Sequence, residues 1–149
     1  MSKIRRLRNF FRISGSDRQL LVMSLILLAT IRLGLWLLPF RTLLKVLAKI
    51  SHPSNAQITN SVTAGKIVWT VNAASRYMPG VMCLARALTT QVIMGRYGLS
   101  GQLRIGVAKT ERGKLEAHAW VEYQGRVAIG NLQDLSRFIP LPSLEGVIL

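Results

Sequence analysis

The chain is poor in acidic residues, cysteine and histidine. Of its 149 residues only six are Asp or Glu, against 20 Lys and Arg, which gives a formal net charge of +14. Its single cysteine excludes an intramolecular disulfide, and one cysteine with two histidines is too few for a thiolate zinc site. We therefore expect a reducing, cytoplasmic location, with no cofactor and no metal.

Apolar side chains are plentiful, because half of the residues are hydrophobic and only 17% are charged. That composition excludes a disordered tail, and the length suits one domain. Residues 1–54 hold ten Lys and Arg against one acid (net +9), and residues 55–149 hold ten against five (net +5). This excess favours an anionic partner. Since no groove-reading motif accompanies it, we do not expect nucleic acid to be that partner.

One long apolar run, Leu20–Leu38, is just long enough to span a bilayer. Arg32 lies inside this run, where a charge is costly within a membrane span. We therefore expect a helix that covers the domain or lies on the membrane surface without spanning it. Arg41, Lys45 and Lys49 follow at a spacing of four, which is typical of a short amphipathic helix.

A polar stretch broken by proline, Ser51–Asn55, divides the chain into a basic, apolar helical region (1–54) and a second domain (55–149). In that second domain, helical spacing predicts two helices, Ile58–Tyr77 and Cys83–Met94. A change to alternating polarity then predicts three antiparallel strands: Gln102–Lys109, Lys114–Tyr123 and Arg126–Asn131. The predicted fold class is α+β, with helices packed on an antiparallel sheet.

Cys83 is the first candidate for chemistry, because it stands where a helix begins after the turn signal Pro79-Gly80. A thiol there faces the positive end of the helix dipole and unpaired backbone N–H groups, which favour the thiolate. The same N–H groups could stabilise an oxyanion. The alternative is a small buried side chain without chemistry, as free cysteines often are.

His118 is the second candidate, on the strand before Gln124-Gly125, a predicted two-residue hairpin turn. The pairs that this register implies are Tyr123–Arg126, Glu122–Val127, Trp120–Ile129 and His118–Asn131. An amide opposite the histidine could hold one ring nitrogen and leave the other free to take a proton from a thiol. A half-buried structural histidine is the alternative.

Three segments, PGVMCLARAL, LRIGVAK and LEAHAWVEYQGRVAIG, resemble the peptidase of lasso-peptide biosynthesis. This transglutaminase-like family is typified by the C-terminal half of the microcin-processing protein B, and the resemblance covers about residues 60–131. It implies a transglutaminase/papain-like core, with Cys83 as the nucleophile and His118 as the base. The third member is usually an aspartate. Here Asn131 stands at that position, and Asp134 is the substitute.

The resemblance implies a cysteine peptidase that removes the leader from a ribosomally made lasso-peptide precursor. It implies three partners: the precursor peptide, a small leader-recognition protein of the winged-helix type, and an ATP-dependent macrolactam cyclase. Contact of residues 1–50 with the inner face of the membrane is a further option. Two alternatives stay open, namely an acyl transferase of the same fold and an inactive scaffold that binds membrane or peptide.

Overall fold

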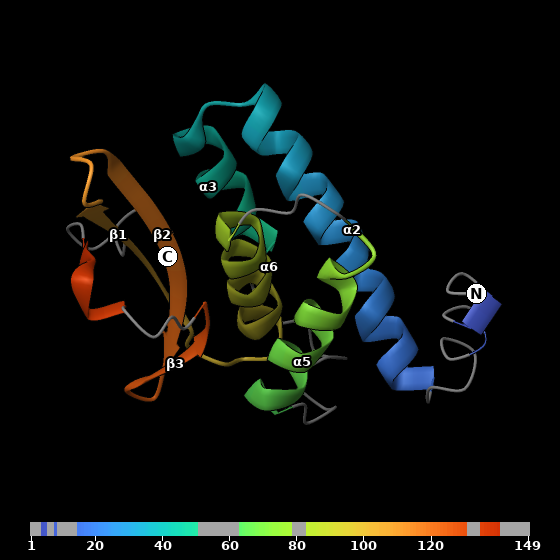
Figure 1. The fold of residues 1–149 in the computed structure, drawn as a ribbon. Coiled ribbons are helices and arrows are strands. Elements are labelled where there is room, and N and C mark those ends of the chain that lie inside the picture. Colours follow the sequence, from blue (N-terminus) through green and yellow to red (C-terminus); the bar gives the residue numbers. More distant parts are fainter. Residues whose placement is uncertain are drawn as a thin grey trace.

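The computed structural model describes residues 4, 5, 8, 15–50, 63–78, 83–130 and 135–140. Its elements are α2 (Gly15–Leu37), α3 (Phe40–Ile50), α5 (Ala64–Ser75), α6 (Cys83–Arg96), β1 (Gln102–Lys109), β2 (Leu115–Tyr123), β3 (Arg126–Ile129), a short 3-10 helix (Leu135–Arg137) and β4 (Ile139–Pro140). The helices form one layer and the strands the other, with α6 lying between the sheet and the remaining helices (Figure 1). The predicted α+β class is confirmed.

The helices follow the sequence pattern closely. The apolar run forms α2, and the chain turns at Leu38 and Pro39 into α3. Thr63 caps α5, where its hydroxyl oxygen accepts a hydrogen bond from the Lys66 backbone N–H at 3.2 Å. The predicted helix Ile58–Tyr77 is observed as Ala64–Ser75, and residues 58–62 lie outside the described residues.

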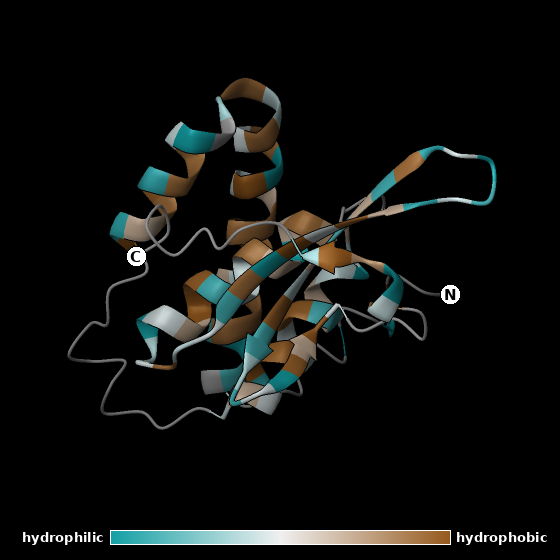
Figure 2. Cartoon of the chain, turned by 90° about the vertical axis from the view of Figure 1, so that its left-hand side faces the viewer, coloured by the Kyte–Doolittle hydropathy of each residue, from teal (hydrophilic) through white to brown (hydrophobic). Residues whose placement is uncertain are grey.

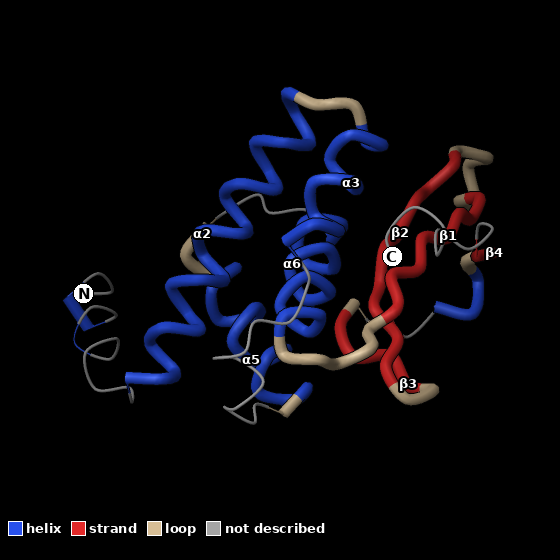
Figure 3. Tube along the Cα trace, turned by 180° about the vertical axis from the view of Figure 1, so that it is seen from behind, coloured by secondary structure: helices blue, strands red, loops and turns tan. Residues whose placement is uncertain are grey.

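The sheet is antiparallel, with strand order β3-β2-β1-β4 (Figure 3). Gly106 of β1 lies opposite His118 of β2. Two residues further along the sheet, on the same face, Arg104 of β1 lies opposite Trp120 of β2. The hairpin of β1 and β2 extends beyond the helical layer (Figure 2). Strand β4 was not predicted. It pairs with β1 only at Gly106 and Val107, so it is too short to show an alternating pattern.

The β2–β3 turn is the predicted one, because Gln124 and Gly125 both have positive φ, 51° and 76°. The first two predicted pairs, Tyr123–Arg126 and Glu122–Val127, are confirmed. The predicted Trp120–Ile129 pair is wrong, since a β-bulge shifts the register and Ile129 pairs with Val121. Ala128 is the extra residue. Asn131 lies outside the described residues, and the unbroken register that predicted its pairing with His118 does not exist.

One core of buried apolar side chains joins the helices to the sheet. Its fully buried members include Leu28 and Ile31 of α2, Leu44 of α3, Ile67 of α5, Leu88 and Ile93 of α6, and Val121 of β2. An ion pair between Asp17 and Lys66 also joins α2 to α5. The two regions predicted on either side of residue 54 therefore share a core. The boundary itself falls outside the described residues.

Candidate active site

Cys83 is the first residue of α6 and is half-buried. The first turn of an α-helix leaves its backbone N–H groups without partners inside the helix, so Cys83 stands at a turn whose donors the helix itself does not pair. Its side chain contacts the edge of the core that α6 shares with α2 and α5. The predicted Pro79-Gly80 turn before it lies outside the described residues.

Helix α6 packs against β2, and the two elements run in the same direction (Figures 1 and 3). The C-terminal end of α6 lies beside the second half of β2, because Met94 and Val121 both approach Gly101. The Cys83 end of α6 is therefore directed toward the first half of β2, which carries His118.

The imidazole of His118 is held by the main chain. Its Nε2 lies 2.6 Å from the carbonyl oxygen of Gly130. A carbonyl can only accept a hydrogen bond, so Nε2 carries the hydrogen, and in the neutral imidazole Nδ1 is then the nitrogen with the lone pair. One ring nitrogen is thus held by a backbone carbonyl, whereas the sequence prediction gave this role to the Asn131 amide, which lies outside the described residues.

Two aromatic rings enclose the histidine on the sheet face away from the helices. The Trp120 ring is stacked at 6.1 Å between centroids, and the Phe138 ring is tilted at 5.6 Å. Gly106 leaves the space for this arrangement, since a Cβ there would meet the Trp120 ring at 2.9 Å. Phe138 comes from the segment before β4 and was not among the predicted site residues.

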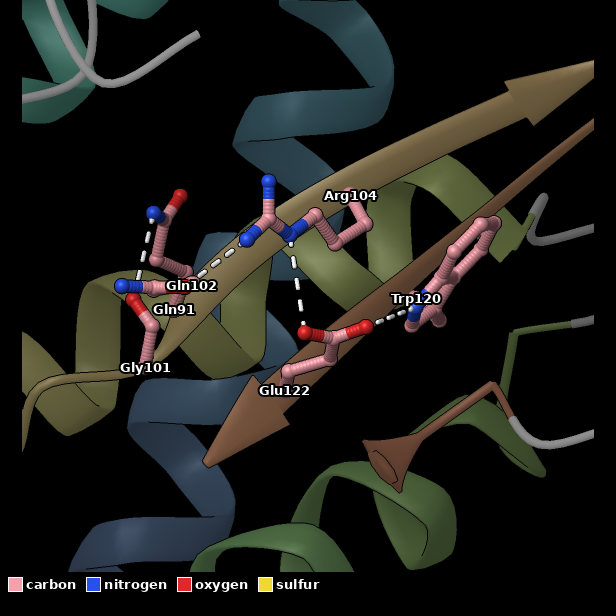
Figure 4. Close-up of polar contacts among 6 residues, drawn as sticks. All are labelled: Gln91, Gly101, Gln102, Arg104, Trp120 and Glu122. Carbon is pink, nitrogen blue, oxygen red and sulfur yellow. Dashed lines mark hydrogen bonds and ion pairs between the residues drawn. The ribbon is translucent and has the colours of Figure 1, made fainter. Parts of the chain in front are cut away.

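Trp120 is fixed in turn by a chain of polar contacts (Figure 4). Its indole N–H donates to Glu122 Oε1 at 3.0 Å, and the other oxygen of Glu122 lies 3.5 Å from Arg104 Nε. Arg104 also donates to the side-chain oxygen of Gln102 at 3.2 Å. These side chains share one face of β1 and β2, so the ring beside His118 has a supported orientation.

Arg86 is a further residue near the candidate nucleophile. It lies three positions after Cys83, and residues with that spacing are neighbours on a helix surface. Its Nε is buried and has no hydrogen-bond partner. The cation was not predicted as a site residue, although its position in CLARAL, one turn from the cysteine, was visible in the sequence.

The structure does not bring all the predicted site residues together. No hydrogen bond joins Cys83 to His118, because Cys83 contacts the helix-side core and the His118 ring lies with Trp120 and Phe138 on the other face. Catalytic hydrogen bonds often form only when substrate binds. Asn131 and Asp134, the two predicted third members, lie outside the described residues. Within the described ranges, no three His, Cys, Asp or Glu residues gather into a metal site.

Comparison with known proteins identifies the family to which the chain belongs. No curated protein and no solved structure matches the chain. The sequence profile of the transglutaminase-like superfamily matches residues 25–143, a range that includes Cys83, His118 and most of α2. Members of this superfamily are usually cysteine peptidases or acyl transferases. Since the match covers most of its length, the chain belongs to the transglutaminase-like superfamily.

Proposed function

We propose that this chain is a cysteine peptidase that removes the leader from a ribosomally made lasso-peptide precursor. The observation that carries the proposal is the hydrogen bond from His118 Nε2 to the Gly130 carbonyl. In the neutral ring it leaves Nδ1 as a base on β2, the strand that packs against the cysteine-bearing helix. Because the ring and Cys83 lie on different faces of that strand, the proposed reaction requires the two side chains to approach each other when substrate binds. The motifs around Cys83 and His118, and their order in the chain, support the same assignment.

The proposed reaction uses the free nitrogen of the imidazole. Nδ1 takes the proton of the Cys83 thiol, and the sulfur attacks the carbonyl carbon of the scissile peptide bond. Backbone N–H groups in the first turn of α6 stabilise the oxyanion. The imidazolium then protonates the leaving amine, and the C–N bond breaks to leave a thioester. Water, giving its proton to His118, hydrolyses the thioester and restores the thiol.

Asn131, with Asp134 as the substitute, is the proposed third member. In this structure the single hydrogen on Nε2 is already donated to the Gly130 carbonyl. A side chain at position 131 would therefore add to an orientation that the backbone provides.

The proposed setting is the cytoplasm, with the precursor as substrate, a winged-helix leader-recognition protein as partner and an ATP-dependent macrolactam cyclase acting on the product. An acyl transferase would use the same thioester and differ only in the acceptor, an amine in place of water.

The test incubates the purified chain with the precursor peptide and the leader-recognition protein encoded beside it, and follows the products by mass spectrometry. We expect release of the leader at one peptide bond, with one water molecule added across that bond. Cys83→Ala should abolish cleavage and keep the circular dichroism spectrum, because alanine occupies most of a cysteine site. Cleavage by a folded Cys83→Ala protein would exclude the mechanism.

The products of the same reaction show whether water or an amine accepts the acyl group from the thioester. A product in which an amine of the partner or substrate has replaced water would establish acyl transfer. No turnover with all three components present would favour the inactive scaffold.

A further inference from the structure

The outer face of α2 is a stripe of exposed apolar side chains. We define this outer stripe as Val22, Ile26, Ala29, Leu33 and Trp36. These residues are three or four apart, so they line one side of the helix from Val22 to Trp36. Ile26, Leu33 and Trp36 are 60%, 54% and 82% exposed, respectively. An apolar stripe of this length on the surface marks an interaction site.

The opposite face of α2 is bound to the domain. Leu20, Leu21, Ser24, Leu28 and Ile31 lie on it and are at most 4% exposed. The hydroxyl of Ser24 donates to the Leu20 carbonyl at 2.9 Å, so this face carries no unpaired side-chain donor. Among the described residues α2 is the one helix long and apolar enough to cross a membrane. Crossing would withdraw these side chains from the core and expose to water the apolar side chains of α5 and α6 that they cover, at a cost of about 1.5–3 kcal/mol for each large side chain exposed.

Helices α2 and α3 carry an excess of positive charge. Within residues 15–50 there are five Lys and Arg and one acid, net +4, and that acid, Asp17, is paired with Lys66. Arg32 is exposed on α2, and Arg41, Lys45 and Lys49 are exposed on α3. An exposed apolar face with a tryptophan, on a helix that also exposes Arg32 and is followed by a basic helix, is typical of segments that lie in the interface of an anionic membrane.

We propose that the outer stripe of α2 rests on an anionic lipid surface, with the helix axis parallel to the membrane plane. A second copy of the chain is the less favourable occupant, since two such helices would bring their cations together without acids to pair with them. The proposal concerns a face of α2 away from the core and does not depend on the peptidase activity.

The test uses vesicles of phosphatidylcholine alone and of phosphatidylcholine with phosphatidylglycerol. We expect the chain to float with the mixed vesicles, and binding to fall as salt rises. In a Trp69→Phe background, Trp36 should shift to shorter emission wavelength on binding and be quenched by brominated acyl chains. Trp120 is buried at 3% exposure and should contribute no shift. Failure to bind the mixed vesicles would overturn the proposal.

Matched variants locate the contact. Leu33→Glu should weaken vesicle binding at least about tenfold, because a charge replaces an apolar group that the lipid surface would bury. Leu115→Glu is the control, since Leu115 is 72% exposed at the β1–β2 hairpin and lies outside the stripe. Equal binding by both variants would contradict the proposal. A dimer that forms without lipid and that Leu33→Glu dissociates would show that a second copy covers the stripe, and would contradict the proposal. Membrane binding that resists extraction by alkaline carbonate would show that α2 spans the membrane, and would contradict it too.

Discussion

At the scale of single residues, a backbone carbonyl orients the candidate base within the described part of the chain. The Gly130 carbonyl accepts from His118, and Gly130 has a φ of +88°, a region that residues with a Cβ rarely adopt. A Cβ at this position would lie 2.7 Å from the Ala119 carbonyl oxygen and 3.0 Å from Trp120 Cα. Glycine is therefore required where the acceptor of the histidine hydrogen bond is formed.

We expect Gly130→Ala to lower the stability by about 2 kcal/mol or more, because left-handed backbone strain adds to a backbone collision. Urea unfolding followed by circular dichroism measures the change. Gly113→Ala is the control, since Gly113 also has positive φ (78°) but nothing lies near its Cβ position. An equal loss in both variants would show that only strain acts.

The side chain at position 131 is expected to contribute less than the histidine. Asn131→Ala should reduce kcat by less than about tenfold, since the Gly130 carbonyl still holds Nε2, whereas His118→Ala should lose nearly all activity. Leader release measured by mass spectrometry gives both rates. A loss in Asn131→Ala as large as that in His118→Ala would show that the amide is the main orienting group. Asp134→Ala tests the substitute in the same way.

The guanidinium of Arg86 leads to a prediction about thermal stability. Its buried Nε has no hydrogen-bond partner, which costs desolvation without compensation. We expect Arg86→Met to leave the melting temperature unchanged or raise it, since methionine keeps the apolar stem and removes the charge. Thermal unfolding checks this. A fall of several degrees would mean that the guanidinium makes a stabilising contact.

At the scale of elements, α2 is both a core helix and a surface helix. We expect Leu28→Ala to cost about 2–5 kcal/mol, because Leu28 is fully buried and its removal leaves a cavity. Ile26→Ala, on the outer stripe of the same helix, should cost less than about 1 kcal/mol. Denaturant unfolding of the two variants compares the faces directly. Similar costs would contradict the two-faced packing.

Most elements were predictable because each carries a local pattern. The helix beginning at Cys83, the strand Gln102–Lys109 and the turn at Gln124-Gly125 all follow from spacing and turn residues. The bulge at Ala128 was not predictable, since alternation counts residues and cannot show an extra one. The Gly130 acceptor was missed for a related reason. Every residue has a main-chain carbonyl, so the sequence alone cannot show which carbonyl accepts the hydrogen bond.

At the scale of the whole molecule, the helical region before residue 54 shares its core with the rest of the chain. Sequence patterns suggested a division because the composition changes at Ser51–Asn55. Periodicity could not show the shared core, since α2 is apolar on both faces and its pattern does not identify the buried one.

Deletion of residues 1–54 should therefore prevent residues 55–149 from folding alone, because Ile67, Val71 and Leu88 would lose neighbours on α2 and α3. Amide dispersion in the NMR spectrum of the truncated chain measures this. A dispersed, cooperative spectrum would show two separable domains.

The order of synthesis gives the two-faced α2 a further consequence. A ribosome adds about 5–20 residues per second, so roughly 3–12 s pass between completion of α2 and completion of α6. During that interval the face holding Leu28 and Ile31 lacks the complete α5 and α6 on which it packs, and the outer stripe is equally uncovered. The nascent chain thus exposes its longest apolar helix on both faces until α5 and α6 are made, and this is the interval in which a chaperone or a nearby lipid surface would shield it.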